Sequence, residues 1–355
     1  MERLDESNRT EADGVQNTLA VFENISDFRV DICSTSVVNG LMTWILKRLK
    51  TKMSFDIVRL YCSELLAALL AFQNNRELLG EIDGVDTLLQ QLALYKRHNP
   101  SSSEEIEYME NLFDCLCAAL LYAPNKVKFL EGEGLQLMNL MLREKKMSRA
   151  SALKVLNYAT MDESGRENCD KFVEILGLRT LFPLFMKSPS QVNRVNLPPE
   201  KHEEHVCSIV CSLLKSCSGQ QKQRVLSKFV ENDHEKVERL MELHFAYMEK
   251  VQAYENTHQR RQQMADDDLE DEYLRKLDAG LFTLQLIDYI MAEVVVFGSV
   301  SIRDRVVKIL NLKGESFDSF KKVLTDYAEV IGDNDKNTPE VMAELNHIRE
   351  LLSKL

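Results

Sequence analysis

Glycine and proline are scarce in this sequence. The chain has 13 glycines and 7 prolines among its 355 residues, which is about half of the usual share of these two residue types. An all-β sandwich or barrel needs many tight turns, and glycine and proline supply most of them. The shortage therefore argues against an all-β fold and favours helices.

An excess of basic residues is also missing. The chain carries 56 acidic and 44 basic side chains, for a formal net charge of −12 at pH 7. A protein that binds nucleic acid neutralises phosphates with lysine and arginine, and the overall negative field opposes this. We therefore expect no direct nucleic-acid binding. The 45% hydrophobic and 28% charged residues are typical of a soluble globular protein.

Long apolar runs are lacking too. Runs such as Leu116 to Ala123 fall far short of the ~20 residues that span a bilayer. The first ten residues are charged rather than apolar, unlike a secretory signal. We expect an intracellular protein that does not bind membranes, and we expect its eight cysteines to be small buried residues without disulfides.

Catalytic signatures are absent. The sequence has no Walker P-loop, no Gly-x-Ser-x-Gly elbow, no His-Glu-x-x-His and no Gly-x-Gly-x-x-Gly after a strand. We predict that the chain is not an enzyme and needs no cofactor. Glu344 and His347 stand at helical spacing, but one such pair cannot build a di-iron site, and we interpret it as a surface contact.

One segment has residue types that ligate zinc: His202, His205, Cys207 and Cys211. Zinc needs ligands that converge on one point. At about 100° per residue, the histidines and the cysteines of a helix here point to different sides. We predict buried cysteines, exposed histidines and no metal.

Apolar residues recur at helical spacing along most of the chain. In the segment from Asp56 to Phe72 they recur every three or four residues and leave the polar ones on the other side. The same pattern predicts helices over residues 104–123, 148–159, 204–217, 235–251, 269–297 and 340–355.

The chain also repeats itself. Asparagine, nine further residues, glycine and an apolar residue recur in the segments that begin at Asn75, Asn125 and Asn168, and an imperfect fourth copy begins at Asp31. The glycines at 40, 84, 134 and 177 are 44, 50 and 43 residues apart, the period of armadillo and HEAT repeats. We predict units of a short helix, a bend at the glycine in a left-handed conformation, a second helix and a longer third helix.

The repeats resemble armadillo units, whose third helices carry an Ala-Leu-x-Asn-Leu-Ala pattern. Asn24 matches its asparagine by position, and Asn157 matches if four residues are inserted in the following loop. In import receptors of this kind a tryptophan four residues earlier stacks on a basic peptide; the matching residues here are Ala20, Glu64, Asp114 and Leu153.

The ladder of tryptophan and asparagine side chains is thus degraded, but two carboxylates stand in it. We take Asn24, Glu64, Asp114 and Asn157 as candidate residues of a peptide groove. Our hypothesis is that Glu64 and Asp114 help to form an acidic concave surface for a basic segment of a partner. The alternative is that both are ordinary solvated helix residues.

Longer strings carry a more specific resemblance. They include Tyr95-Lys-Arg-His-Asn-Pro100 and residues 75–81, 132–146, 176–189, 203–209, 240–244, 277–282 and 289–293. In this order they are similar to the beta-catenin-like family of armadillo proteins, which belong to pre-mRNA splicing complexes. The resemblance covers essentially the whole chain.

This resemblance implies a nuclear adaptor. It would bind basic, localisation-signal-like segments of splicing factors, including the Myb-like component of the Prp-nineteen-type complex. The alternative is an importin-like nuclear transport receptor, which would need the tryptophan and asparagine ladder. Family members extend further at the N-terminal side, with a basic nuclear-targeting stretch, so we expect this chain to be a truncated form.

Charge patterns complete the expected organisation. Residues 266–272 hold six acids in seven positions and predict a solvated break. We expect an all-α, armadillo/HEAT-like right-handed superhelical solenoid over residues 1–263, the acidic break over 264–272 and a C-terminal helical cap over 273–355. The basic clusters at 47–52 and 143–146 are interpreted as the last turns of helices, where cations meet the negative end of the dipole.

Overall fold

The structure is a computed structural model of the chain. It describes residues 8–28, 37–51, 54–188, 198–262, 269–334 and 338–355. The described residues are helices and connecting turns without a strand, as the sequence predicts. Their packing divides the chain into two compact units, Met1–Thr180 and Leu181–Leu355.

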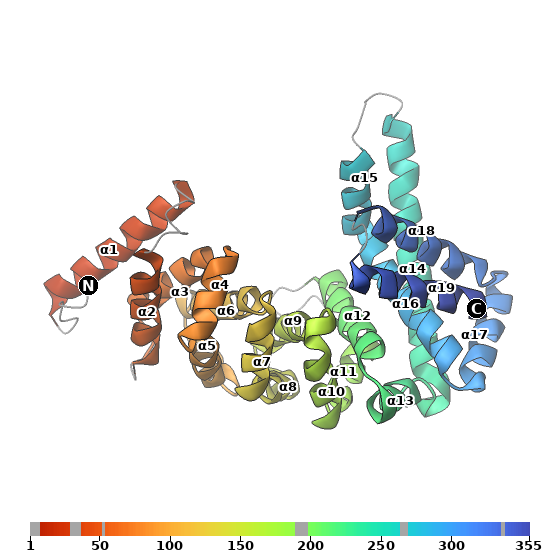
Figure 1. The fold of residues 1–355 in the computed structure, drawn as a ribbon, viewed down its shortest axis with the longest axis horizontal. Coiled ribbons are helices and arrows are strands. Elements are labelled where there is room, and N and C mark those ends of the chain that lie inside the picture. Colours follow the sequence, from red (N-terminus) through yellow and green to blue (C-terminus); the bar gives the residue numbers. More distant parts are fainter. Residues whose placement is uncertain (1–7, 29–36, 52–53, 189–197, 263–268, 335–337) are drawn as a thin grey trace. The chain divides into compact units, whose positions relative to one another are not determined.

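The first unit is built of helical repeats in two layers (Figure 1). The third helices α1, α3, α6 and α9 pack in succession in one layer, and helices α2, α4, α5, α7 and α8 pack in the other. The helices are α1 (Arg9–Phe28), α2 (Val37–Lys50), α3 (Ile57–Leu69), α4 (Gln73–Glu81), α5 (Gly84–Leu92), α6 (Ser103–Ala119), α7 (Ala123–Glu131), α8 (Gly134–Glu144), α9 (Arg149–Thr160) and α10 (Arg166–Glu174), with short 3-10 turns η2 (Ala93–Tyr95) and η3 (Glu163–Gly165). Helix α11 (Leu178–Met186) contains the boundary between the units.

The repeated asparagine joins one repeat to the next. The amide nitrogen of Asn75 donates to the Leu69 carbonyl at 2.7 Å, that of Asn125 donates to Ala119 at 3.0 Å, and that of Asn168 donates to Ala159 at 3.1 Å. Each acceptor lies at the end of a third helix, where carbonyls lack a partner within the helix. The asparagine period of the sequence therefore has a structural cause.

The repeated glycine is required by close packing. A Cβ on Gly134 would lie 2.3 Å from the Phe129 ring, and Gly84 and Gly177 meet Leu79 and Phe172 in the same way. The predicted bend is confirmed at these three positions, but the left-handed residue is the one before each glycine. For the fourth copy the predicted bend is wrong. Gly40 lies within α2, and a Cβ there would meet nothing within 4 Å.

The second unit surrounds one apolar helix. Helix α16 packs against α12, α14, α17, α18 and α19. The unit contains α12 (Pro199–Ser216), α13 (Gly219–Ser227), α14 (Glu231–Gln262), α15 (Leu269–Lys276), the π-helical turn η4 (Leu277–Leu281), α16 (Phe282–Phe297), α17 (Val300–Lys313), α18 (Asp318–Asn334) and α19 (Pro339–Lys354). Regular helical geometry in α14 resumes after His234, because residues 232–234 are left-handed, and the sequence predicts a helix from residue 235.

The stretch Glu272–Phe297 is long and apolar enough to cross a membrane, and it is the one such stretch in the described part of the chain. Of its most apolar window, 67% is buried inside the protein. A helix at the centre of a bundle is apolar on all sides for this reason. Its composition is thus explained by packing within the second unit.

One residue of the basic cluster at 47–52 has a structural role. Arg48 is buried and forms an ion pair with Asp56 at 2.8 Å, while Lys52 lies outside the described residues. Seven cysteines lie in the described residues, and all of them are buried, which confirms their predicted burial. Residues 264–268 of the predicted acidic break lie outside the described residues, and the proposed cap boundary stays a prediction.

Candidate functional site

The third helices of the first unit carry five carboxylates, of which Glu64 interacts electrostatically with Glu23 and Glu107, and Glu110 with Asp114. Glu23 lies on α1, Glu64 on α3, and Glu107, Glu110 and Asp114 on α6. We call these five residues the acidic ladder. It includes the two carboxylates proposed from the repeat alignment.

Glu64 lies between two other carboxylates. The side chain is half-buried, and burial, followed by the negative charges of Glu23 and Glu107, raises the pKa of Glu64 to about 7. Both causes disfavour the charged form. Within the described residues, neither Glu64 nor Glu107 has a lysine or arginine within ion-pairing distance. Glu64 and Glu107 therefore lack a cationic partner among the described residues.

Asp114 has a different environment from Glu64. It is 54% exposed and pairs with Lys154 of α9 at 2.8 Å. Nearby, the Ser151 hydroxyl donates to Glu110 at 2.6 Å, and burial raises the pKa of Glu110. Sequence analysis did not identify Lys154 as the partner of Asp114. The signal was present, because the two residues lie 40 positions apart, close to one repeat.

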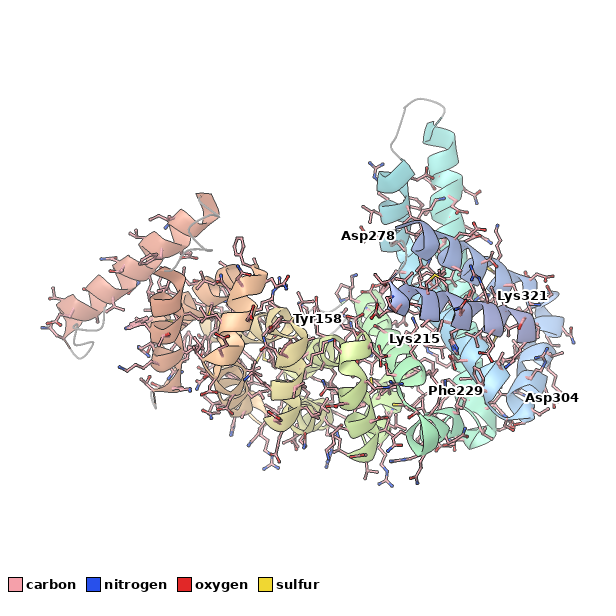
Figure 2. The ribbon with its side chains drawn as sticks, viewed as in Figure 1. Tyr158, Lys215, Phe229, Asp278, Asp304 and Lys321 are labelled. Carbon is pink, nitrogen blue, oxygen red and sulfur yellow. The ribbon has the colours of Figure 1, made fainter. Side chains whose placement is uncertain are left out.

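The two asparagines differ as well. Asn24 is exposed, and its amide nitrogen donates to the Ala20 carbonyl of its own helix at 2.7 Å. Asn157 lies on α9, directly before Tyr158, which is labelled in Figure 2. Its Oδ1 is buried without a hydrogen-bond donor among the described residues. The structure brings Glu64 together with Glu23 and Glu107; in the described residues, no hydrogen bond joins either asparagine to Glu64 or Asp114.

The zinc-like segment is part of the core of α12. Cys207 and Cys211 are buried as predicted, but His202 and His205 are also buried, so the prediction of exposed histidines is wrong. His202 Nε2 lies 3.2 Å from the Leu184 carbonyl. A helix buried on several sides hides both histidine and cysteine faces. In the part of the chain that the structure describes, no group of three or more histidine, cysteine and carboxylate residues could hold a metal ion.

Glu344 and His347 do more than make a surface contact. Glu344 accepts hydrogen bonds from Lys215 at 2.5 Å and from the Tyr327 hydroxyl at 3.1 Å; Lys215 is marked in Figure 2. His347 contacts Glu293, which is fully buried on α16. The pair thus fastens α19 to helices α12, α16 and α18, and its interpretation as a surface contact is corrected.

Glu293 also has a cationic partner. Lys222 of α13 lies 3.0 Å from its carboxylate, and the Tyr289 hydroxyl donates to it at 3.2 Å. A buried carboxylate needs such partners, because desolvation penalises an isolated charge. This cluster is a structural one within the second unit.

Another buried pair was missed by sequence analysis. His244 Nδ1 lies 2.6 Å from Asp288 Oδ1, and both side chains are fully buried. Burial raises the pKa of Asp288 to about 6, and the His244 ring stacks on Phe320 with centroids 4.0 Å apart. Neither side chain is accessible to a substrate from solvent. The two residues lie on α14 and α16, 44 positions apart in the sequence. No local sequence motif therefore predicts the pair.

These observations define the class of the protein. Helical units repeat at the armadillo period, and their third helices stack in one layer. Three of these helices, α1, α3 and α6, carry the acidic ladder. The chain is an all-α armadillo-repeat protein.

The comparisons with known proteins give the particular family. The chain belongs to the family described as "Catenin-beta-like, Arm-motif containing nuclear", whose model matches residues 1–325. It is 57% identical over 342 residues to beta-catenin-like protein 1 of Bos taurus and 56% identical to that of Homo sapiens, covering 94% of this chain. It is 30% identical over 359 residues to the beta-catenin-like protein 1 homolog of Schizosaccharomyces pombe, covering 98% of this chain. The chain spans 61% of the length of each of these relatives.

Proposed function

We propose that this chain is a non-enzymatic protein-binding adaptor, and that its acidic ladder accepts basic, localisation-signal-like segments of partner proteins. The observation that carries the proposal is the cluster of Glu23, Glu64 and Glu107. Its half-buried central carboxylate has a raised pKa and no described cationic partner. A lysine or arginine of a partner would supply the missing charge.

The energetic argument favours a bound cation over an empty cluster. Like charges held together raise each other's pKa, and a cation placed among them reverses that effect. The gain at one such site is modest, about 1 kcal/mol for a partly exposed pair. Several weak contacts along an extended segment therefore have to add together.

At Asp114, binding of a basic segment would exchange one ion-pair partner for another. Asp114 already pairs with Lys154, so a basic segment would have to displace that lysine. The exchange replaces one exposed pair with another and has little net energy. We therefore assign most of the affinity to the cluster around Glu64.

We further propose that the partners are splicing factors, including the Myb-like component of the Prp-nineteen-type complex. The family to which the chain belongs is described as nuclear, which supports a nuclear location. The adaptor role in splicing rests on the resemblance to beta-catenin-like proteins. An importin-like receptor is disfavoured, because Ala20, Glu64, Asp114 and Leu153 occupy the tryptophan positions.

Affinity purification from nuclear extract tests this proposal. The wild-type chain should retain splicing proteins, and the double variant Glu64→Lys with Asp114→Lys should lose them. Recovery of transport factors alone would favour the receptor. Equal recovery of splicing proteins by both chains would remove the acidic ladder from the proposal.

A further inference from the structure

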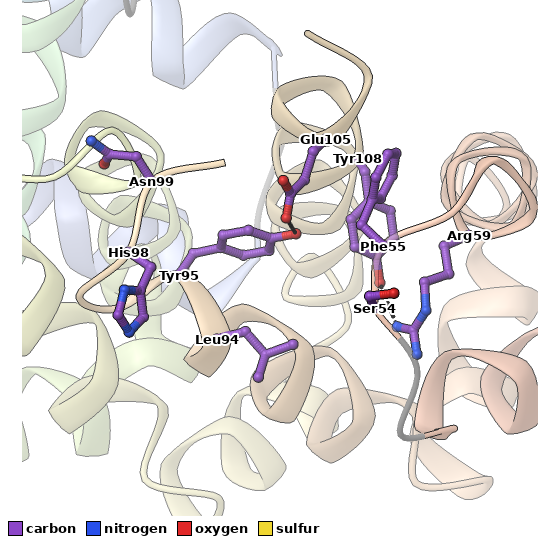
Figure 3. A pocket seen from close by; sticks show the side chains of 9 residues that line it. All are labelled: Ser54, Phe55, Arg59, Leu94, Tyr95, His98, Asn99, Glu105 and Tyr108. Carbon is purple, nitrogen blue, oxygen red and sulfur yellow. Dashed lines mark hydrogen bonds between the residues drawn. The ribbon is translucent and has the colours of Figure 1, made fainter. Parts of the chain in front are cut away.

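A pocket in the first unit is lined by a buried arginine that has no counter-ion among the described residues. The pocket, of about 310 Å³, lies between the segment leading into α3, the turn η2 and the start of α6. Figure 3 shows its walls: Arg59 and Tyr108 lie on one side, and Tyr95 and Glu105 on the other. None of these residues belongs to the acidic ladder.

Arg59 is only 2% exposed. Its guanidinium donates to the carbonyl oxygens of Leu49 and Thr51 and to Gln91 Oε1. Leu49 lies at the end of α2, whose dipole offers partial negative charge to a cation. These partners are neutral groups, and among the described residues no carboxylate lies within ion-pairing distance of the guanidinium.

One nitrogen of this guanidinium has no acceptor. Arg59 Nε is buried and forms no hydrogen bond with any described residue. A buried donor without an acceptor costs about 1–3 kcal/mol, and more for a charged group. The arginine is thus held in place by its terminal nitrogens but is not satisfied.

Tyr108 provides a second donor at the same wall. Its hydroxyl oxygen accepts a hydrogen bond from Arg59 Nη1 at 3.4 Å, and its own proton reaches no acceptor in the described part of the chain. Burial raises the pKa of Tyr108 to about 12. The hydroxyl therefore keeps its proton at neutral pH and can donate a hydrogen bond.

The polar groups of the opposite wall already have hydrogen-bond partners. The Tyr95 hydroxyl donates to Glu105 Oε1 at 3.3 Å, and the Ser101 backbone and hydroxyl donate to Oε2 at 2.7 and 2.6 Å. The Glu105 carboxylate places negative charge on that side, which disfavours a doubly charged ligand such as phosphate. The remaining lining includes the Phe55 ring and Leu94, which is 58% exposed.

We propose that this pocket binds a carboxylate attached to an apolar group. The carboxylate would accept a hydrogen bond from the Tyr108 hydroxyl and act as counter-ion to Arg59, and the apolar group would cover Phe55 and Leu94. This charge-assisted contact is stronger than a contact between neutral groups. The ligand has the opposite charge to the basic segments proposed for the acidic ladder, so this site is independent of that function.

The test follows the Arg59 Nε–H signal by NMR while the protein is titrated with phenylacetate or with its neutral analogue phenylacetamide. The signal should move and saturate with phenylacetate, and phenylacetamide and inorganic phosphate should each bind at least tenfold more weakly. The Tyr108→Phe variant should bind phenylacetate at least fivefold more weakly. Tyr95→Phe, the matched control on the satisfied wall, should change the affinity less than twofold.

N-acetyl-Gly-Phe with a free or an amidated C-terminus distinguishes the source of the carboxylate. Binding of the free form places a peptide C-terminus in the pocket; binding of phenylacetate alone restricts it to small carboxylates. No saturable shift with phenylacetate, or equal binding of phenylacetamide, would overturn the proposal. If Tyr108→Phe melts well below the wild type, the comparison of acid with amide on the wild-type protein decides the matter.

Discussion

Three helices each contribute one carboxylate to a cluster with the half-buried Glu64 at its centre and Glu23 and Glu107 beside it. The folded chain holds this proton more tightly than an unfolded chain does, because the folded pKa is about 7 against an ordinary value of 4.5. The stabilising effect of the protonated form is therefore complete below about pH 4.5 and is lost as the pH rises through 7. Such a position lowers stability at physiological pH, as expected where charge is kept for binding.

The Glu64→Gln variant tests this reading of the residue. At pH 8 its melting temperature should exceed that of the wild type, because the repulsion from Glu23 and Glu107 is removed, and the difference should vanish near pH 4.5. Its affinity for a lysine-rich peptide should fall about three- to fivefold, corresponding to about 1 kcal/mol. Thermal unfolding at both pH values and fluorescence anisotropy provide the measurements.

Asp86→Asn is the matched control. Asp86 is an exposed acid on α5, in the layer opposite the third helices. Its replacement should leave both the pH dependence and the peptide affinity unchanged. A Glu64→Gln variant that behaves like this control would show that the position has no special role.

At the scale of the element, glycines with the same sequence context have different structural roles. Gly134→Ala should lower the free energy of unfolding by about 1–3 kcal/mol, because the new Cβ would meet the Phe129 ring at 2.3 Å. Gly40→Ala should raise it by about 0.5–1 kcal/mol, because the position is helical and open. Urea unfolding of the two variants is the measurement, and equal effects would contradict the assignment of the bend.

The buried carboxylate of α16 gives another prediction for elements. Lys222→Met should lower the free energy of unfolding by about 3 kcal/mol, because Glu293 remains buried with one partner fewer. The double variant Lys222→Met with Glu293→Leu should recover at least half of that loss, since the buried charge is removed together with its partner. A double variant that is less stable than Lys222→Met would show that the carboxylate itself is required.

Local sequence patterns predict those structural features that depend on residues close together in the chain. The helices, the repeat period and the bends at Gly84 and Gly134 follow from spacing and from one residue type. Arg59 could not be recognised in this way, because its partners Leu49, Gln91 and Tyr108 lie 10, 32 and 49 positions away.

The same limit applied to the candidate site. The alignment of repeats predicted which residues stand on the third helices, and Glu64 and Asp114 do so. It did not distinguish their electrostatic surroundings, because these depend on Lys154 and on Glu23 and Glu107 in neighbouring helices. The histidines of α12 were misplaced because helical angles alone do not show how many sides of a helix are covered.

At the scale of the molecule, net charge and local charge have to be separated. The chain carries −12 overall, so any basic peptide is attracted to it to some extent. A test of the acidic ladder therefore needs a control with the same change of charge elsewhere. Asp86→Lys with Glu131→Lys provides one, because both residues are exposed on helices of the other layer.

The central claim is that the acidic ladder binds basic segments, and one measurement tests it most directly. The affinity of a lysine- and arginine-rich peptide is measured at several salt concentrations for the wild type, for Glu64→Lys with Asp114→Lys, and for the control pair. The account predicts at least tenfold weaker binding and a flatter salt dependence for the ladder variant, with the control within threefold of the wild type. Equal affinity and equal salt dependence of the two double variants would contradict it.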